Sequence, residues 1–102
     1  MTQSADDKGW SGVRESDATW ALHALGWILS DEPRAERLLG MTGLAPETLR
    51  ASLDQRATLA AILSFLAAHE PDLVACAAVL GIDPMELAAA ARRLEGNERM
   101  EA

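Results

Sequence analysis

The chain has 102 residues, of which 49% are apolar and 25% are charged, with a formal net charge of −7. This length suits one domain with a single core. The acidic balance disfavours binding to nucleic-acid phosphates unless the nine scattered cations gather on one face. Alanine, the best helix former, is the most frequent residue, so an all-α fold is expected.

Residues 1–15 are polar and contain two glycines, which predicts a mobile leader. This stretch shows no apolar signal segment, and no part of the chain approaches the roughly 20 apolar residues of a membrane helix. A cytoplasmic location is therefore expected. Trp10 is the exception in the leader, and we expect it either to latch onto another molecule or to cover a groove of its own domain.

A first helix is predicted over residues 16–30, with Ser16 and Asp17 as N-cap candidates. It is apolar almost all round, which predicts a buried, central helix. Its small or polar residues form one narrow stripe, and a similar stripe recurs in the helix predicted to follow Asp54. The two stripes either pack against each other or face water; the first comprises Thr19, His23, Gly26 and Ser30.

Five more helices are predicted from the residues that start and stop them. Proline opens the second, third, fifth and sixth helices, and glycine ends the second, fifth and sixth. The expected starts are Pro33, Pro46, Asp54, Pro71 and Pro84, with stops at Gly43, Gly81 and Gly96. Residues 96–102 are expected to form a frayed tail.

These start and stop residues occur twice along the chain. Glu32-Pro33 returns as Glu70-Pro71, and the Gly-x-x-Pro turn at Gly43 returns at Gly81, after the same interval. We call this interval, 38 residues from Glu32 to Glu70, the repeat offset. Such repeated spacing indicates a duplicated structural unit. The sequence therefore predicts a compact six-helix domain over residues 16–95, built from two three-helix halves, 16–53 and 54–94.

The repeated turn resembles that of a helix-turn-helix, which makes nucleic-acid binding an alternative function. The helices that follow the turns begin with acidic residues or alanines, which do not read base edges. The alternative depends on four arginines converging on one surface: Arg50, Arg56, Arg92 and Arg93.

Catalytic patterns are scarce, so no enzyme activity, metal or cofactor is expected. The two histidines, His23 and His69, lie in no metal-binding or paired-acid motif. Cys76 sits in an Ala/Val/Leu run, where burial raises the thiol pKa and the lone thiol forms no internal disulfide. Small-ligand binding or catalysis would require a pocket that contains one of the histidines.

Two tryptophans on the first predicted helix are spaced so that they share one face. Trp20 and Trp27 are interpreted as core anchors, with a protein-interaction face as the alternative, together with His23. The apolar surplus and the lack of catalytic patterns favour a non-enzymatic protein-interaction module, which is either a homodimer or a binder of another protein.

Several stretches resemble a small alphaproteobacterial family known only as a domain of unknown function, family 3572. The resemblance covers roughly residues 16–95. Its most specific part is the stretch from Thr42-Gly43-Leu44 through Pro46 to Leu49-Arg50, preceded by Ala24 to Ile28. It implies a compact all-helical domain and carries no activity, cofactor or catalytic residue.

Overall fold

The computed structural model describes residues 13–96, which form six α-helices and no strand. The predicted all-α, six-helix fold is therefore confirmed. Each observed helix lies within a few residues of a predicted one. The helices are α2 (Glu15–Leu29), α3 (Glu32–Thr42), α4 (Pro46–Ala51), α5 (Arg56–Ala67), α6 (Glu70–Leu80) and α7 (Pro84–Glu95).

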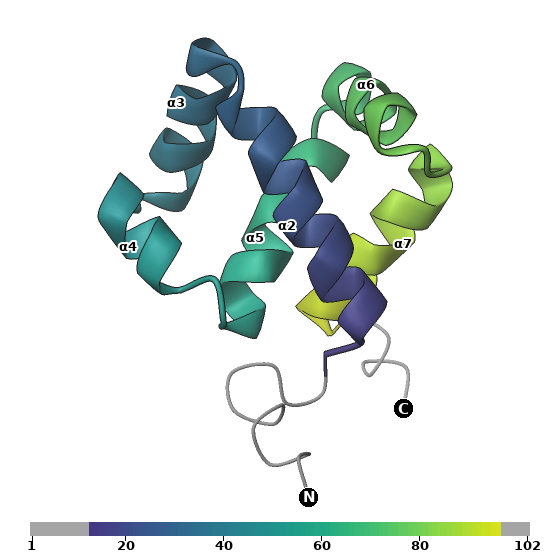
Figure 1. Ribbon diagram of the computed structural model, residues 1–102, viewed down its shortest axis with the longest axis horizontal. Coiled ribbons are helices and arrows are strands. Elements are labelled where there is room, and N and C mark those ends of the chain that lie inside the picture. The colour runs from purple at the N-terminus through teal and green to yellow at the C-terminus, as the bar shows by residue number, and fades with distance from the viewer. Residues whose placement is uncertain (1–12, 97–102) are drawn as a thin grey trace, which may run out of the picture.

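Helices α2 and α5 cross at the centre, with α3 and α4 on one side and α6 and α7 on the other (Figure 1). The most extensive packing joins α5 to α7, and α2 packs mainly on α5. Helix α5 buries seven of its twelve residues, the largest share of any described helix. It forms the centre of the core more fully than α2 does.

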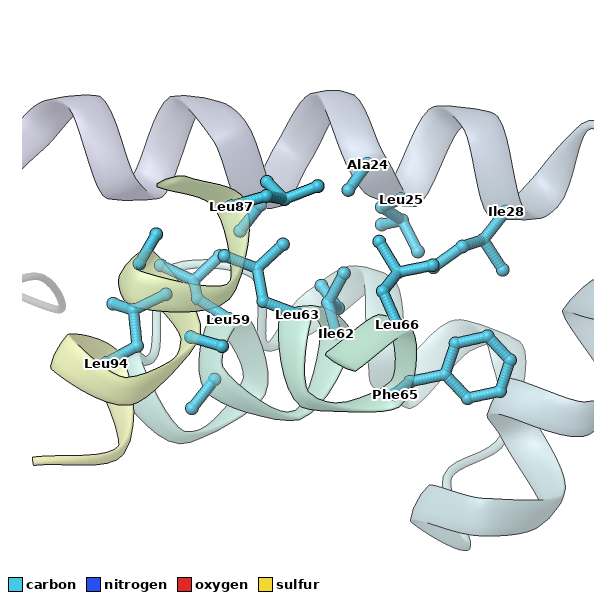
Figure 2. Packing of buried hydrophobic residues seen from close by; sticks show 14 of the residues in the cluster. Ala24, Leu25, Ile28, Leu59, Ile62, Leu63, Phe65, Leu66, Leu87 and Leu94 are labelled. Atoms are coloured by element: carbon cyan, nitrogen blue, oxygen red, sulfur yellow. The ribbon is translucent and has the colours of Figure 1, made fainter. Parts of the chain in front are cut away.

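The core lies where α2, α5 and α7 meet (Figure 2). Helix α2 contributes small residues together with Leu25 and Ile28, so its backbone lies close to that of α5. Helix α5 fills the space with larger aliphatic side chains and Phe65, while α7 closes the far side with Leu87 and Leu94. The principal fully buried side chains are Ile28, Leu38, Leu59, Ile62, Leu63, Leu66 and Leu87.

The helix boundaries repeat at the predicted spacing. Helix α3 begins at Glu32 and α6 at Glu70, and each contains 11 residues. The starts of α4 and α7, at Pro46 and Pro84, are separated by the same repeat offset. Gly43 and Gly81 end α3 and α6 with φ of 73° and 75°, a left-handed conformation that favours glycine.

Side-chain caps also occur at two of the predicted helix starts. The Asp31 carboxylate accepts a hydrogen bond from the Arg34 backbone N–H at 3.1 Å, and the Asp83 carboxylate accepts one from the Met85 N–H at 2.8 Å. Each bond satisfies a donor that the first helical turn leaves unpaired. These contacts fix the starts of α3 and α7.

The predicted cap of the first helix is wrong. Helix α2 begins at Glu15, with Arg14 at the N-cap and no side-chain cap. Asp17 lies inside the first turn, is 1% exposed, and accepts two hydrogen bonds from the Arg93 guanidinium at 2.8 and 2.9 Å. A partner from the last helix therefore determines the role of Asp17, which local capping preference does not reveal.

The first small-residue stripe faces water and does not pack on its counterpart. All four of its residues are exposed, and none of the four counterpart residues on α5 and its C-cap is fully buried: Ala57, Ala61, Ser64 and Ala68. Helix α2 is also less buried than predicted, since Leu29 is 48% exposed. The two helices instead pack through the adjacent faces shown in Figure 2.

The two halves differ in their third helix. Helix α4 contains six residues and buries only Leu49, whereas α7 contains twelve and buries Leu87, Ala90, Ala91 and Leu94. The Arg56 guanidinium donates to the backbone oxygens of Leu94 and Arg93, at 2.8 and 3.0 Å, and so holds the end of α7 against α5. The first half lacks such a cover over α2.

The predicted leader, 1–15, and tail, 96–102, fall mostly outside the described residues. Val13, the first residue described, is partly buried and packs on the core, and Glu15 already belongs to α2. Within residues 13–96, no single helix meets the length and apolarity needed to cross a membrane. Helices α5 and α6 meet it only as a pair bent by 110°.

Candidate functional site

An apolar groove lies between the end of α2, the face of α3 that carries Ala35 and Leu39, and the short helix α4. Its volume is about 360 Å³. Leu25 and Leu49 are almost fully buried, whereas Leu29 at the edge is 48% exposed. The groove, called here the α3–α4 groove, is lined by Leu25, Leu29, Ala35, Leu39, Pro46, Leu49, Arg50 and Leu53.

Helix α4 forms one short wall of this groove. After Ala51 the chain turns through residues 52–55 into α5, so nothing in the first half matches the later turns of α7. Among the leucines that line the groove, Leu29 at the end of α2 is the exposed one. Exposed aliphatic groups in a concave site are the usual lining of a binding groove.

A second groove occupies the corresponding place in the other half, between α6 and α7. Its volume is about 320 Å³, and four of its lining positions follow those of the α3–α4 groove by the repeat offset. These four pairs are Leu29 and Ala67, Ala35 and Leu73, Pro46 and Pro84, and Arg50 and Ala88. The repeat thus places a groove at the same point of each half.

The two grooves differ in charge. The α6–α7 groove is lined by both Glu70 and Arg92, whereas Arg50 is the only ionisable residue lining the α3–α4 groove. The first groove is therefore the more apolar. It is the stronger candidate for a site that buries aliphatic side chains of a partner.

Four exposed acids neighbour lining residues of the α3–α4 groove, along the sequence or one helix turn away, and we call them the rim acids: Glu32, Glu36, Glu47 and Asp54. Within residues 13–96, the ion pairs of α3 use Arg34 and Arg37, and none of the ion pairs there joins a base to a rim acid. The rim is therefore acidic around an apolar floor.

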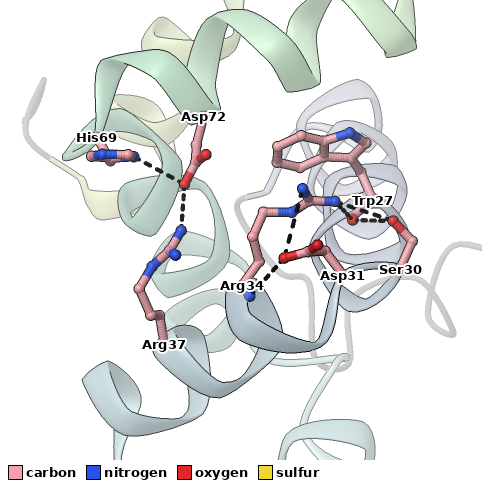
Figure 3. Close-up of polar contacts among 7 residues, drawn as sticks. All are labelled: Trp27, Ser30, Asp31, Arg34, Arg37, His69 and Asp72. Carbon is pink, nitrogen blue, oxygen red and sulfur yellow. Dashed lines mark hydrogen bonds and ion pairs between the residues drawn. The ribbon is translucent and has the colours of Figure 1, made fainter.

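The bases of α3 are engaged away from the groove (Figure 3). The Arg34 guanidinium lies 3.6 Å from the centre of the Trp27 ring and donates to the Trp27 carbonyl at 2.7 Å and to Ser30 Oγ at 3.2 Å. Cation–π stacking and a charged donor to the last carbonyls of α2 both stabilise this arrangement.

Arg37 links α3 to α6. Its guanidinium donates to the Asp72 carboxylate at 2.7 Å, and His69 Nδ1 lies 3.0 Å from the same oxygen. Figure 3 shows Asp72 between the two bases. His69 is paired with Asp72 and lines none of the grooves described here.

Three of the four predicted interaction residues, Trp20, His23 and Trp27, lie on α2. Trp20 and Trp27 are partly buried and pack on the core, which agrees with their interpretation as anchors. His23 is exposed and meets the Trp20 ring edge-on, with centroids 6.4 Å apart. Trp10 lies outside the described residues.

The four arginines of the nucleic-acid alternative do not converge. Arg56 donates to the end of α7, and Arg93 is paired with buried Asp17. Arg92 is exposed beside the α6–α7 groove, and Arg50 lies in the α3–α4 groove, on helices that do not pack substantially on each other. A basic surface beside a helix N-terminus is therefore not formed by these residues.

The described residues contain no group of three or more His, Cys, Asp or Glu side chains placed to hold a metal ion. Cys76 is fully buried, as predicted, and burial raises the pKa of its thiol to about 11. A thiol that stays protonated at neutral pH is neither a nucleophile nor a general base there.

Sequence reasoning missed the α3–α4 groove, although the sequence contains one signal for it. Leu25, Leu29, Leu39 and Leu53 read as ordinary core positions on amphipathic helices. The signal is the short segment between Pro46 and the next predicted helix start at Asp54, which allows only a short helix as the wall formed by α4. Only the packing shows which leucines remain exposed.

The fold and groove define a compact all-α domain with an apolar groove on one side. Residues 14–97 match the family described as "Protein of unknown function (DUF3572)". The chain belongs to this family, which confirms the resemblance noted in its sequence. No curated protein and no solved structure matches the chain.

Proposed function

We propose that this protein is a non-enzymatic helical interaction module that binds an amphipathic helix of another protein in the α3–α4 groove. The observation that carries this proposal is an open groove with seven aliphatic or proline residues among its eight lining residues. A helix that lays its apolar face into such a groove gains most of its affinity from burying side chains.

The shape of the groove supports a helix rather than a small polar substrate. Two of its walls are the helices α2 and α3, and its only charged lining residue is Arg50. A volume of about 360 Å³ lies at the lower end of ligand sites, roughly 300–1,000 Å³. That space suits a few aliphatic anchors spaced i, i+3 or i+4, and i+7.

The cellular location of the interaction is inferred from the single cysteine and from the family. One fully buried cysteine suits a reducing compartment, which supports a cytoplasmic protein. Similarity to the family noted above supports a bacterial cell. A partner segment that folds into a helix on binding fits such an intracellular module.

Site-specific photocrosslinking in the native cell tests the proposal. A photoreactive amino acid replaces Leu29 at the groove edge, and a matched control replaces Val79, which is 67% exposed on α6 and lines none of the described grooves. A discrete crosslinked protein is expected only at Leu29, with its attachment points confined to one short helical segment of the partner.

Two point variants complete this test. Leu29→Glu is expected to abolish the crosslink formed from position 50, which is exposed and lines the groove, and Val79→Glu is expected to leave it intact. Because both residues are already exposed, each change alters the free energy of unfolding by only about 0.5 kcal/mol. Equal labelling at both positions, or a product that consists of two copies of this chain, contradicts the proposal.

A further inference from the structure

We infer that the helix bound in the α3–α4 groove is basic, with lysine or arginine residues on the flanks of its apolar face. This inference rests on the proposed function and adds the charge of the partner. It follows from the rim acids, which neighbour lining residues of the groove and form no ion pair within the described part of the chain.

Helix α3 separates its charges between two sides. Residues three apart share a helix face, so Glu32 lies beside Ala35 and Glu36 lies beside Leu39, both of which line the groove. The bases Arg34 and Arg37 turn instead toward Trp27 and Asp72 (Figure 3). The groove side of α3 therefore carries negative charge that no base of α3 neutralises.

The opposite wall adds to this pattern. Glu47 follows the lining residue Pro46, and Asp54 follows the lining residue Leu53. Arg50 is the single base among them, and it suits one acidic side chain or the C-terminal carbonyl groups of the bound helix. The equivalent groove of the second half is lined by Glu70, at the position that corresponds to Glu32.

The rim acids are expected to influence which helices bind more than how tightly they bind. Each exposed ion pair contributes little, but several together raise the association rate of a basic helix and disfavour an acidic one. The formal charge of −7 acts in the same direction. Since a Debye length is about 10 Å at 0.1 M salt, most of this attraction disappears in concentrated salt.

Selection from a displayed peptide library tests the inference without a known partner. The library fixes apolar anchors at i, i+4 and i+7 on helices of about 15 residues and randomises the flanking positions among Lys, Glu and Gln. Peptides that bind the full-length protein in the groove are expected to be enriched in lysine. Their affinity should fall roughly tenfold when the salt concentration is raised from about 50 mM to about 500 mM.

Charge-reversed variants locate the effect. The double variant Glu32→Lys/Glu36→Lys is expected to weaken a selected lysine-rich peptide roughly tenfold and to strengthen its glutamate-substituted version. The matched control Glu15→Lys/Glu86→Lys changes net charge equally at exposed acids in the first turns of α2 and α7, outside the helices α3 and α4. That control is expected to change affinity less than about threefold.

The outcomes separate this inference from the proposed function. Groove-binding peptides without lysine enrichment, or equal effects of the two double variants, overturn the basic-partner inference and leave the groove intact as a helix site. Peptides that still bind the Leu29→Glu variant, or a library that yields no groove binder, overturn the proposed function itself. Circular dichroism of every variant verifies that its helices are retained.

Discussion

Cys76 shows how one side chain responds to its surroundings. It is fully buried in α6, and desolvation raises its pKa from 9.0 to about 11, with Arg34 lowering and Asp72 raising it to smaller extents. A thiol without access to water stays protonated and unreactive at neutral pH. Its role is therefore packing between α6 and the core.

The raised pKa predicts a stability change at alkaline pH. The folded state holds the thiol proton more tightly than the unfolded chain, so its stabilising contribution is complete below pH 9 and is lost as pH rises toward 11. About 2–3 kcal/mol should disappear over that window. Urea unfolding of wild type and Cys76→Ala checks this, since the variant should be less stable at pH 7 but show a smaller decline.

At the scale of elements, the turns after α3 and α6 determine where the chain reverses. Gly43 and Gly81 hold positive φ angles, and a Cβ at either position meets no atom within 4 Å. The requirement for glycine is thus a matter of backbone conformation rather than crowding. Each turn is followed by a proline at the start of the next helix, Pro46 in α4 and Pro84 in α7.

Alanine substitution at these turns is expected to destabilise both halves similarly. Gly43→Ala and Gly81→Ala should each lower the free energy of unfolding by roughly 1–2 kcal/mol, because an L-residue is strained in the left-handed region. Gly40→Ala is the matched control: it is helical, exposed and equally uncrowded, and should stabilise α3 by roughly 0.5–1 kcal/mol. Urea unfolding measures all three variants, and losses that differ by more than about twofold between the turns would argue against equivalent halves.

At the scale of the whole molecule, two ion pairs tie distant parts of the chain together. Arg93 on α7 binds Asp17 on α2, joining the first and last described helices, and Arg37 binds Asp72 across α3 and α6. The first pair is largely buried, whereas the Arg37 side chain is 51% exposed. The buried pair is the more sensitive to mutation because removing one partner strands a desolvated charge.

Substitutions at the buried Asp17–Arg93 pair are expected to lower the free energy of unfolding more than a substitution at the exposed Arg37–Asp72 pair. Arg93→Met leaves the Asp17 carboxylate without its charged partner and is expected to cost about 3 kcal/mol, more than Asp17→Asn. The double variant Asp17→Leu/Arg93→Met should lose less than the sum of the single losses, as a double-mutant cycle in urea would show. Arg37→Met, at the exposed pair, should cost under about 1 kcal/mol; strict additivity at Asp17 and Arg93 would contradict a coupled pair.

The helices and their spacing could be predicted from the order of residues alone. Alanine content, proline starts, glycine stops and the acid before Pro84 act within one or two turns of backbone, so local chemistry predicts them. The same locality explains the one failed cap. Asp17 has good capping chemistry, but a guanidinium 76 residues away binds it more strongly than a local N–H does.

Which apolar residues are covered became clear only from the packing of the helices. Leu25 and Leu29 lie one turn apart on α2 and look alike in sequence, yet Leu25 is 7% exposed and Leu29 is 48% exposed, because only Leu25 faces the core cluster. The segregation of acids and bases around α3 arises in the same way, from the positions of Trp27 and Asp72. Burial depends on contacts between distant segments, and residue spacing along one helix does not specify them.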